Sequence, residues 1–329
     1  MGEGSDMTEK SDNIGSAAAF LSKGELVAIP TETVYGMAAN AFDEDAVKEI
    51  FRVKNRPFYN PLILHTDSIE KIEQWDVALP PRLRRLAETF WPGPLTLLLP
   101  RSKKIPTNVT AGLERVAFRI PSHPLTRSLL AQLDFPVAAP SANPFGYVSP
   151  TSADHVMRHF NGVIAMVLDG GSCDVGIEST IVGEEDGKII IYRLGGLSVE
   201  QIERVIGNVE IRTSSSKPDA PGMLERHYSP KKDVIAVDTQ EEIEEQVIEE
   251  SAYILFLLEP PGFDLPNVIH LTPGGNHEKA ARQFYHALRN WDDDPDIKRI
   301  IVERLPDFGL GRAINDRLKR AAGSQNLEP

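Results

Sequence analysis

One short segment constrains this chain more than any other: an apolar run that ends in hydroxyl and carboxylate side chains. Residues 26–29 (Leu-Val-Ala-Ile) have the composition of a buried strand, and Pro30 ends it. Residues 31–33 (Thr-Glu-Thr) follow directly, and Tyr35 comes two residues later. Because α/β proteins bind ligands where buried strands end, the sequence predicts an α/β fold with a binding site at this point.

Strand and helix patterns alternate from about residue 14 to residue 211, which predicts one α/β unit. The predicted strands lie at residues 26–29, 61–65, 95–99, 116–120, 135–139, 163–168, 179–182 and 189–192. The predicted helices lie at residues 43–52, 82–90, 125–133 and 152–160. The last two strands flank a Glu-Glu-Asp-Gly turn and should form an antiparallel hairpin, so we expect a mixed sheet rather than a purely parallel one.

A change of composition then separates a second unit from the first. Residues 212–231 are rich in Ser, Pro and Gly, which is typical of a linker. Residues 232–322 alternate strand and helix again, and a Thr-x-x-Glu capping pattern at residues 239–242 opens a helix that we expect to reach residue 250. This predicts a small, parallel α/β domain. The first 13 residues are polar and acidic, and we expect them to form a frayed tail.

Composition narrows the class of protein further. The chain has 329 residues, a net charge of -13, and no apolar run near the length of a membrane span. Its first residues lack the features of an export signal, and Cys173 is the single cysteine, so we expect a cytoplasmic protein. An acidic chain disfavours a long nucleic-acid surface, whereas a local group of cations suits a small anion such as a nucleotide. The cations available for such a group are Lys48, Arg52, Lys54, Arg56, Arg115 and Arg119.

Two of these cations follow the helix predicted at residues 43–52. Lys54 and Arg56 should lie on an exposed, extended loop stiffened by prolines, where a spacing of two residues aims both side chains the same way. We expect them to bind phosphate, Arg56 through paired hydrogen bonds and Lys54 as a point charge, with Asn60 within reach. The alternative is that they are surface cations that compensate the helix dipole.

Other polar residues follow further predicted strands. His65 and Arg119 end two strands, and Arg119 is placed to pair with the carboxylate of an amino acid. Ser141 and Asn143 come just after a third strand. Ser149 begins a Ser-Pro-Thr segment before a helix, which can serve both as an N-cap and as an anion site.

Several common catalytic motifs are absent. His155 and His159 are spaced as zinc ligands can be, but no glutamate lies between them. Cys173 has no recognisable nucleophile context, and the sequence contains neither a GxxxxGK[ST] phosphate loop nor a GxSxG elbow. We therefore expect neither a covalent nucleophile nor a metal ion held by the protein itself.

In combination, these motifs resemble the YrdC-like family of threonylcarbamoyl-AMP synthases. The resemblance rests on residues 31–36 (Thr-Glu-Thr-Val-Tyr-Gly), 54–56 (Lys-Asn-Arg), 61–65 (Pro-Leu-Ile-Leu-His), 140–143 (Pro-Ser-Ala-Asn) and 178–180 (Glu-Ser-Thr). Residues 226–230 (Arg-His-Tyr-Ser-Pro) resemble the linker of the family's longer, two-domain form. The resemblance implies a YrdC-like mixed, twisted open sheet with helices over residues 14–211, and a small Rossmann-like α/β domain over residues 232–322.

The resemblance also implies a reaction. L-threonine, bicarbonate and ATP would give L-threonylcarbamoyladenylate, pyrophosphate and water. Downstream tRNA threonylcarbamoyl-transfer proteins would then modify the tRNA adenosine next to the anticodon. Mg²⁺ is expected to accompany ATP, held mainly by the nucleotide and water. Catalysis would come from positioning and from cations beside phosphate charge.

The matching family positions imply two groups of site residues. The threonine-binding group is Thr33, His65, Arg119 and Ser179, with Tyr35 beside the methyl group of threonine. The ATP-binding group is Lys54, Arg56, Asn60, Ser141, Asn143, Ser149, Arg193 and Tyr228, in which Lys54 and Arg56 would stabilise phosphate charge. We expect the linker to cover the site as a lid, with Arg226 near the phosphates.

Two other functions compete with this one. The first is an RNA-binding module of the same fold, which the net charge of -13 disfavours. The second is an enzyme that transfers a carbamoyl group from carbamoyl phosphate and shares this domain. Such relatives usually carry zinc-finger cysteines, and this chain has one cysteine.

Overall fold

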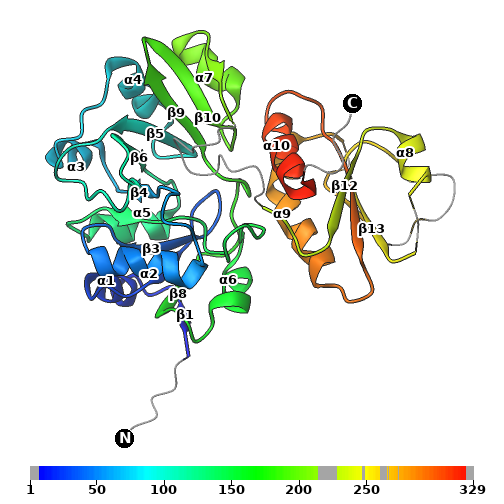
Figure 1. Cartoon of the computed structure of the whole chain (residues 1–329), viewed down its shortest axis with the longest axis horizontal. Coiled ribbons are helices and arrows are strands. Elements are labelled where there is room, and N and C mark those ends of the chain that lie inside the picture. The colour runs from blue at the N-terminus through cyan, green and yellow to red at the C-terminus, as the bar shows by residue number, and fades with distance from the viewer. Residues whose placement is uncertain are drawn as a thin grey trace, which may run out of the picture.

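The chain forms two lobes in the computed structural model, which describes residues 7–213, 228–246, 249–259, 265, 267–272 and 274–323. Figure 1 shows the lobes side by side, each with its own sheet. We call them the N-terminal lobe, built on an eleven-stranded sheet, and the C-terminal lobe, built on a four-stranded sheet. None of the helices in the described ranges is both long and apolar enough to cross a bilayer.

The large sheet is mixed, as the sequence predicts. Its strand order is β1-β8-β2-β3-β7-β4-β6-β5-β9-β10-β11. The bounds are β1 (Glu9–Ser11), β2 (Val27–Ile29), β3 (Gly36–Asn40), β4 (Ile63–His65), β5 (Leu95–Pro100), β6 (Arg115–Arg119), β7 (Val137–Ala138), β8 (Met166–Leu168), β9 (Thr180–Glu185), β10 (Lys188–Arg193) and β11 (Glu210–Ile211). Strand β4 is parallel to β6, whereas β2–β3 and the predicted hairpin β9–β10 are antiparallel.

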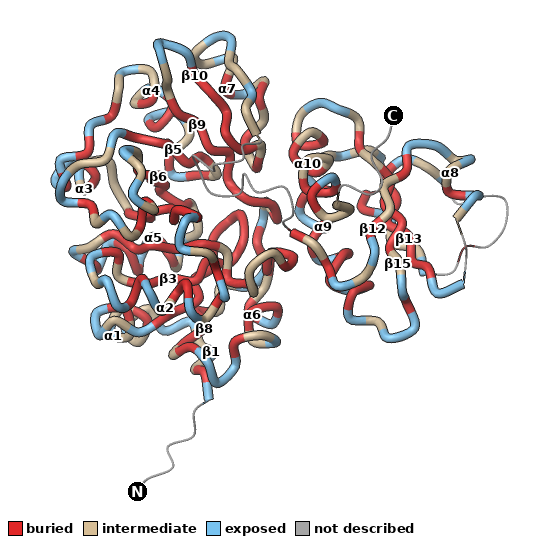
Figure 2. Tube along the Cα trace, viewed as in Figure 1, coloured by how far each residue is buried: buried red, intermediate tan, exposed pale blue. Residues whose placement is uncertain are grey.

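Seven helices pack against this sheet in the described part of the N-terminal lobe. They are α1 (Ile14–Ser22), α2 (Glu44–Lys54), α3 (Ile69–Gln74), α4 (Pro81–Phe90), α5 (Pro124–Ala131), α6 (Ala153–Phe160) and α7 (Val199–Ile206). Helix α2 shows why the local sequence folds this way: the Asp43 carboxylate accepts hydrogen bonds from two backbone N–H groups at its start, and Asn55 ends it in the left-handed conformation (φ 52°). The strands that end at the predicted site are buried in the middle of the lobe (Figure 2).

The C-terminal lobe has the predicted small parallel sheet. Its strands lie in the order β12 (Asp233–Val237), β15 (Arg299–Glu303), β13 (Ser251–Leu255) and β14 (Val268–His270), and all pairs are parallel. Its helices are α8 (Gln240–Glu244), α9 (His277–Asp293) and α10 (Gly311–Ala322). The prediction that the first of these helices reaches residue 250 is wrong, since α8 ends at Glu244. Glutamates four residues apart, such as Glu241 and Glu245, repel one another along a helix and disfavour its extension.

The prediction of a frayed N-terminus is wrong for residues 9–11. Strand β1 pairs in parallel with β8 at the edge of the large sheet. The Thr8 hydroxyl donates to the backbone carbonyls of Phe160 and Ile164, at 3.0 and 2.7 Å, and anchors the strand. The segment has no apolar periodicity, so nothing local marks it as a strand. Helices α1, α3 and α7 and strands β3 and β11 were also not predicted.

The two lobes are docked tightly. One apolar core joins Val34, Val148 and Ile177 of the N-terminal lobe to Phe284 and Leu288 of helix α9. Gly176 (φ +79°) lies directly against this helix: a Cβ atom there would be 2.5 Å from the Cα atom of Arg282. The backbone of the N-terminal lobe therefore approaches α9 as closely as a glycine allows.

This close approach gives a test with a matched control. Gly171 has almost the same backbone conformation (φ +78°), but no atom lies within 4 Å of the position that a Cβ atom would take there. Gly171→Ala should lower the free energy of unfolding by about 1–2 kcal/mol, because alanine is strained in the left-handed conformation but meets no neighbouring atom there. Gly176→Ala should cost about 1–3 kcal/mol more, because the methyl group collides with α9. Chemical denaturation of both variants measures the difference, and equal losses would mean that the lobes are not packed this closely.

Candidate active site

A pocket opens where several strands of the large sheet end. Thr31, Thr33 and Val34 follow β2, His65 ends β4, Arg119 ends β6, Ser179 precedes β9 and Arg193 ends β10. The lining residues are Thr31, Thr33, Val34, Gly36, Arg56, Pro61, Leu62, Ile63, His65, Arg119, Ala139, Pro140, Ser141, Glu178, Ser179, Arg193 and Tyr228. The pocket therefore contains the whole predicted threonine-binding group, and Arg56, Ser141, Arg193 and Tyr228 of the predicted ATP-binding group.

The segment after β2 holds Arg119 in place. The Arg119 guanidinium donates from Nη1 to the Thr33 hydroxyl at 2.8 Å. Its Nη2 atom lies 2.7 Å from a Glu32 carboxylate oxygen, and both side chains are almost fully buried. The Thr31 hydroxyl lies 2.8 Å from that of Thr33 and also donates to the Val34 carbonyl at 2.6 Å. Arg119 is therefore fixed by a carboxylate on one side and a hydroxyl on the other.

His65 presents a neutral ring to the pocket. Its Nδ1 atom lies 3.2 Å from the Ile63 carbonyl, and because a carbonyl only accepts, Nδ1 carries the proton. Burial, followed by the positive charge of Arg119, lowers the pKa of His65 to about 3. The imidazole is therefore uncharged at neutral pH.

Ser179 and Arg193 are joined by a pair of hydrogen bonds. Arg193 donates from Nε to the Ser179 carbonyl and from Nη2 to the Ser179 hydroxyl, both at 3.0 Å. The Thr96 hydroxyl lies 2.7 Å from the Ser179 hydroxyl. The side chain of Ser179 is thus oriented by two neighbours.

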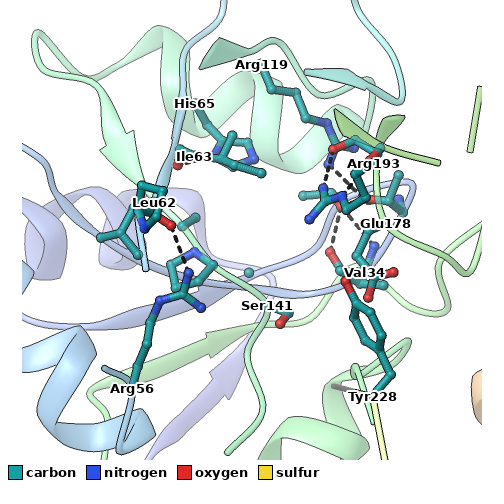
Figure 3. A pocket seen from close by; sticks show the side chains of 17 residues that line it. Val34, Arg56, Leu62, Ile63, His65, Arg119, Ser141, Glu178, Arg193 and Tyr228 are labelled. Atoms are coloured by element: carbon teal, nitrogen blue, oxygen red, sulfur yellow. Dashed lines mark hydrogen bonds between the residues drawn. The ribbon is translucent and has the colours of Figure 1, made fainter. Parts of the chain in front are cut away.

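Arg56 reaches the pocket from the other side. It donates to the carbonyls of Asn60 and Pro61, at 3.2 and 2.8 Å. Figure 3 shows Arg56 on one side, Arg193 and Tyr228 on the other, and Ser141 between them. Burial lowers the pKa of Arg56 to about 9, so it remains a cation at neutral pH.

The position expected for Lys54 and Arg56 is wrong. Lys54 and Arg56 were predicted to share an exposed, extended loop, but they are only 2% and 8% exposed. Lys54 is the last residue of α2. The left-handed turn at Asn55 changes the direction of the backbone, so the side chains of Lys54 and Arg56 do not point the same way. The Lys54 ammonium donates to the carbonyls of Ser141, at 2.6 Å, and Asn143, and Lys54 does not line the pocket. It fixes the Ser141 segment from behind.

Three further members of the predicted ATP-binding group also lie outside the pocket lining. Asn143 donates from Nδ2 to the carbonyls of Pro144 and Tyr147, and Ser149 donates to Glu178 at 2.6 Å. The cap of α6 is Ser152 rather than Ser149. Asn60 is fully buried, and among the described residues neither polar atom of its amide has a hydrogen-bond partner.

Two aromatic residues behave differently from each other. Tyr35 was expected beside the substrate methyl group, but its hydroxyl donates to the Gly171 carbonyl at 2.8 Å and its side chain does not line the pocket. Tyr228 lines the pocket and is 1% exposed. Arg226, which was expected near the phosphates, lies outside the described residues.

Glu178 is a pocket residue for which no role was predicted. Its buried carboxylate accepts hydrogen bonds from Ser149, from Tyr285 of α9 and from Arg317 of α10. Burial would raise its pKa, but the charges of Arg317 and Arg193 and the Ser149 hydrogen bond outweigh this and lower it to about 2. The motif at residues 178–180 marked this position, but nothing in the sequence of the C-terminal lobe indicated its partners.

Charge defines what this pocket can hold. Three arginines and one glutamate line its described walls, and the glutamate is already paired with Arg317. Buried cations in excess favour anionic ligands, such as phosphate or carboxylate groups. No group of three or more His, Cys, Asp or Glu residues in the described ranges is arranged to hold a metal ion. The fold and the pocket thus define an α/β protein whose pocket suits small ligands that carry phosphate or carboxylate groups.

Comparison with known proteins identifies the family. The family model described as "Telomere recombination" (Sua5_yciO_yrdC) matches residues 19–195, and the one described as "Threonylcarbamoyl-AMP synthase, C-terminal domain" matches residues 197–323. The threonylcarbamoyl-AMP synthase of Pyrococcus abyssi is 41% identical over 93% of both chains, and that of Bacillus subtilis is 39% identical over 97% of this chain and 96% of its own length. The crystal structure of P. abyssi Sua5 complexed with L-threonine has a TM-score of 0.89 and 37% identity, covering 97% of this chain and 98% of that one.

The chain belongs to the threonylcarbamoyl-AMP synthase family, in its two-domain form. Its activity is therefore that of a nucleotidyltransferase that makes threonylcarbamoyl-AMP for tRNA modification. This confirms the family, fold class and activity predicted from the motifs, in preference to an RNA-binding module or a carbamoyl-phosphate enzyme.

The state of His65 predicts a pH dependence of stability. In the unfolded chain a histidine has a pKa near 6.5, whereas the pKa of His65 in the folded protein is about 3. The unfolded state therefore binds more protons between these values, and stability falls as the pH drops. From pH 7 to pH 5 the wild type should lose about 2 kcal/mol more than His65→Gln, which cannot titrate. Urea denaturation at both pH values measures this; equal losses would mean that His65 is not held neutral.

Proposed function

We propose that this pocket combines L-threonine, bicarbonate and ATP into threonylcarbamoyl-AMP, pyrophosphate and water. The observation that carries this assignment is the excess of buried arginines over carboxylates in one pocket that is also lined by small hydroxyl side chains. The amine of threonine and bicarbonate would form an N-carboxylate, losing water. A carboxylate oxygen would then attack the α-phosphorus of ATP, and the bond to pyrophosphate would break.

Threonine is assigned to the part of the pocket around Arg119. The P. abyssi relative was crystallised with L-threonine, and we extend that ligand to this chain. The fixed guanidinium of Arg119 suits a carboxylate, and the hydroxyls of Thr33 and Ser179 suit the polar groups of an amino acid. The neutral ring of His65 adds a polar contact without a charge.

ATP is assigned to the part between Arg56 and Arg193. These cations face the pocket from opposite sides, so phosphates placed between them would have positive charge on both flanks. Ser141 supplies a hydroxyl between them, and Tyr228 lines the same part of the pocket. Lys54 would act indirectly, through the carbonyl of Ser141. Asn60, Asn143 and Ser149 remain candidates that would need local rearrangement to reach the nucleotide.

Mg²⁺ is proposed to arrive with ATP, where it would neutralise phosphate charge. Of the carboxylates at this site, Glu32 is paired with Arg119 and Glu178 with Arg317, so neither is a ready metal ligand. The ion would therefore be held by phosphate oxygens and water. The protein's own contribution is to orient the reactants and to place cations beside the phosphates.

We propose residues 14–211 as the catalytic domain, 212–231 as the connecting segment and 232–322 as the second domain. The product would pass to tRNA threonylcarbamoyl-transfer proteins in the cytoplasm. The transfer proteins must bind tRNA, whereas this chain would hand over a small molecule and so would need no long nucleic-acid surface of its own.

The reaction can be tested by omission. Purified protein should release pyrophosphate from ATP only when threonine and bicarbonate are both present, because the attacking carboxylate forms from the two together. The measurement is a coupled pyrophosphate assay with each component left out in turn. Equal release without threonine or without bicarbonate would contradict the proposed reaction.

The division of the pocket can be tested at Thr33. Thr33→Val removes the hydroxyl that accepts from Arg119 at almost constant volume, so threonine should bind about tenfold or more weakly. ATP affinity in the absence of threonine should change little. Thr110→Val is the matched control, since Thr110 is similarly buried, its hydroxyl donates to the nearby Thr107 carbonyl, and it lies outside the pocket lining. Calorimetry that finds ATP binding weakened instead would reverse the assignment.

A further inference from the structure

A charged residue of the C-terminal lobe reaches the pocket wall of the N-terminal lobe. Arg317 of α10 is completely buried and donates from Nε to the Glu178 carboxylate at 2.9 Å. The same guanidinium donates from Nη2 to the Leu194 carbonyl, at 2.6 Å, beside Arg193. It thus contacts the N-terminal lobe on both sides of the segment that carries the pocket residues Ser179 and Arg193.

Arg317 also supports the aromatic wall of the pocket. Its guanidinium lies over the ring of Tyr228, 4.9 Å from the centroid. Tyr285 of α9 stacks on the same ring, with centroids 6.0 Å apart, and donates its hydroxyl to Glu178 at 2.9 Å. Two helices of the C-terminal lobe therefore position both Glu178 and Tyr228, which line the pocket (Figure 3).

We propose that Arg317 is a positioning residue for the reaction: it neutralises Glu178, so that the pocket's arginines remain available to the phosphates of ATP. A buried carboxylate without this partner would be an uncompensated negative charge in the pocket wall. It would repel the phosphates and draw Arg193 towards itself. Docking of the C-terminal lobe would then set the charge of the active site in the N-terminal lobe.

The inference rests on the proposed function, because it assigns phosphates to the part of the pocket that Glu178 faces. It goes further by giving the C-terminal lobe a specific electrostatic role. If Arg317 only contributed packing, ATP binding lost in an Arg317 variant would not return when the charge of Glu178 is also removed. The proposed electrostatic role predicts that it does return.

The test is a charge cycle on the full-length protein. Arg317→Met keeps the apolar stem of the side chain but removes its charge. It should raise the Kd and KM for ATP by about ten- to a hundredfold, with a smaller change in the KM for threonine. Glu178→Gln alone should have a modest effect. The double variant Glu178→Gln/Arg317→Met should recover ATP affinity to near that of Glu178→Gln.

Arg312→Met is the matched control. Arg312 lies on the same helix and also forms an ion pair with the N-terminal lobe, to Glu200 at 3.4 Å, but it is far less buried and outside the pocket lining. This variant should leave ATP binding unchanged. If Arg317→Met binds ATP like Arg312→Met, or if the double variant shows no recovery, the inference is overturned.

A third variant decides the matter if Arg317→Met does not fold. Tyr285→Phe removes only the hydroxyl that donates to Glu178, and it should still raise the KM for ATP about threefold or more. An unchanged KM there would overturn the inference. Failure of the proposed function would look different, because the wild type itself would then release no pyrophosphate that depends on threonine and bicarbonate.

Discussion

Burial of positive charge at one end of the large sheet is the constraint that shapes this protein. Lys54, Arg56, Arg119, Arg193 and Arg317 are all buried, in a chain whose net charge is -13. A buried cation is tolerated only when oxygen atoms surround it. Backbone carbonyls do this for Lys54 and Arg56, and the carboxylates of Glu32 and Glu178 do it for Arg119 and Arg317. The turns and strand ends around the pocket are held where these contacts need them.

These contacts also prepare the site for its ligands. Each arginine that faces the pocket is already fixed by hydrogen bonds to the protein, so little reorganisation is needed when a negative charge arrives. Fixed cations stabilise developing phosphate charge better than mobile ones, because the protein has already met the cost of orienting them. This suits a reaction that needs no covalent nucleophile.

Features that depend on local pattern could be predicted from the sequence, and those that depend on distant contacts could not. Apolar strands with polar residues at their ends are local, so the mixed sheet was predicted correctly, and the polar ends of several predicted strands do meet in one pocket. The left-handed turn at Asn55, which sends Lys54 behind the pocket, was not. Strand β1 was missed because its stability comes from pairing with β8, far along the chain. Arg317 and Tyr285 meet Glu178 across 139 and 107 residues, and the amphipathic pattern of their helices does not separate an arginine that faces solvent from one buried against another lobe.

One apolar core connects the wall of the pocket to the C-terminal lobe. Val34 and Tyr228 line the pocket and also belong to the apolar core that includes Phe284 and Tyr285 of α9. Moving the C-terminal lobe away would therefore expose part of the pocket wall to water at the same time as it separated Arg317 from Glu178. An acyl-adenylate is a mixed anhydride that water destroys, so exclusion of water and the correct charge are both needed while it forms. Because one interface supplies both, the same packing that stabilises the two-lobed fold also completes the pocket in which the proposed chemistry takes place.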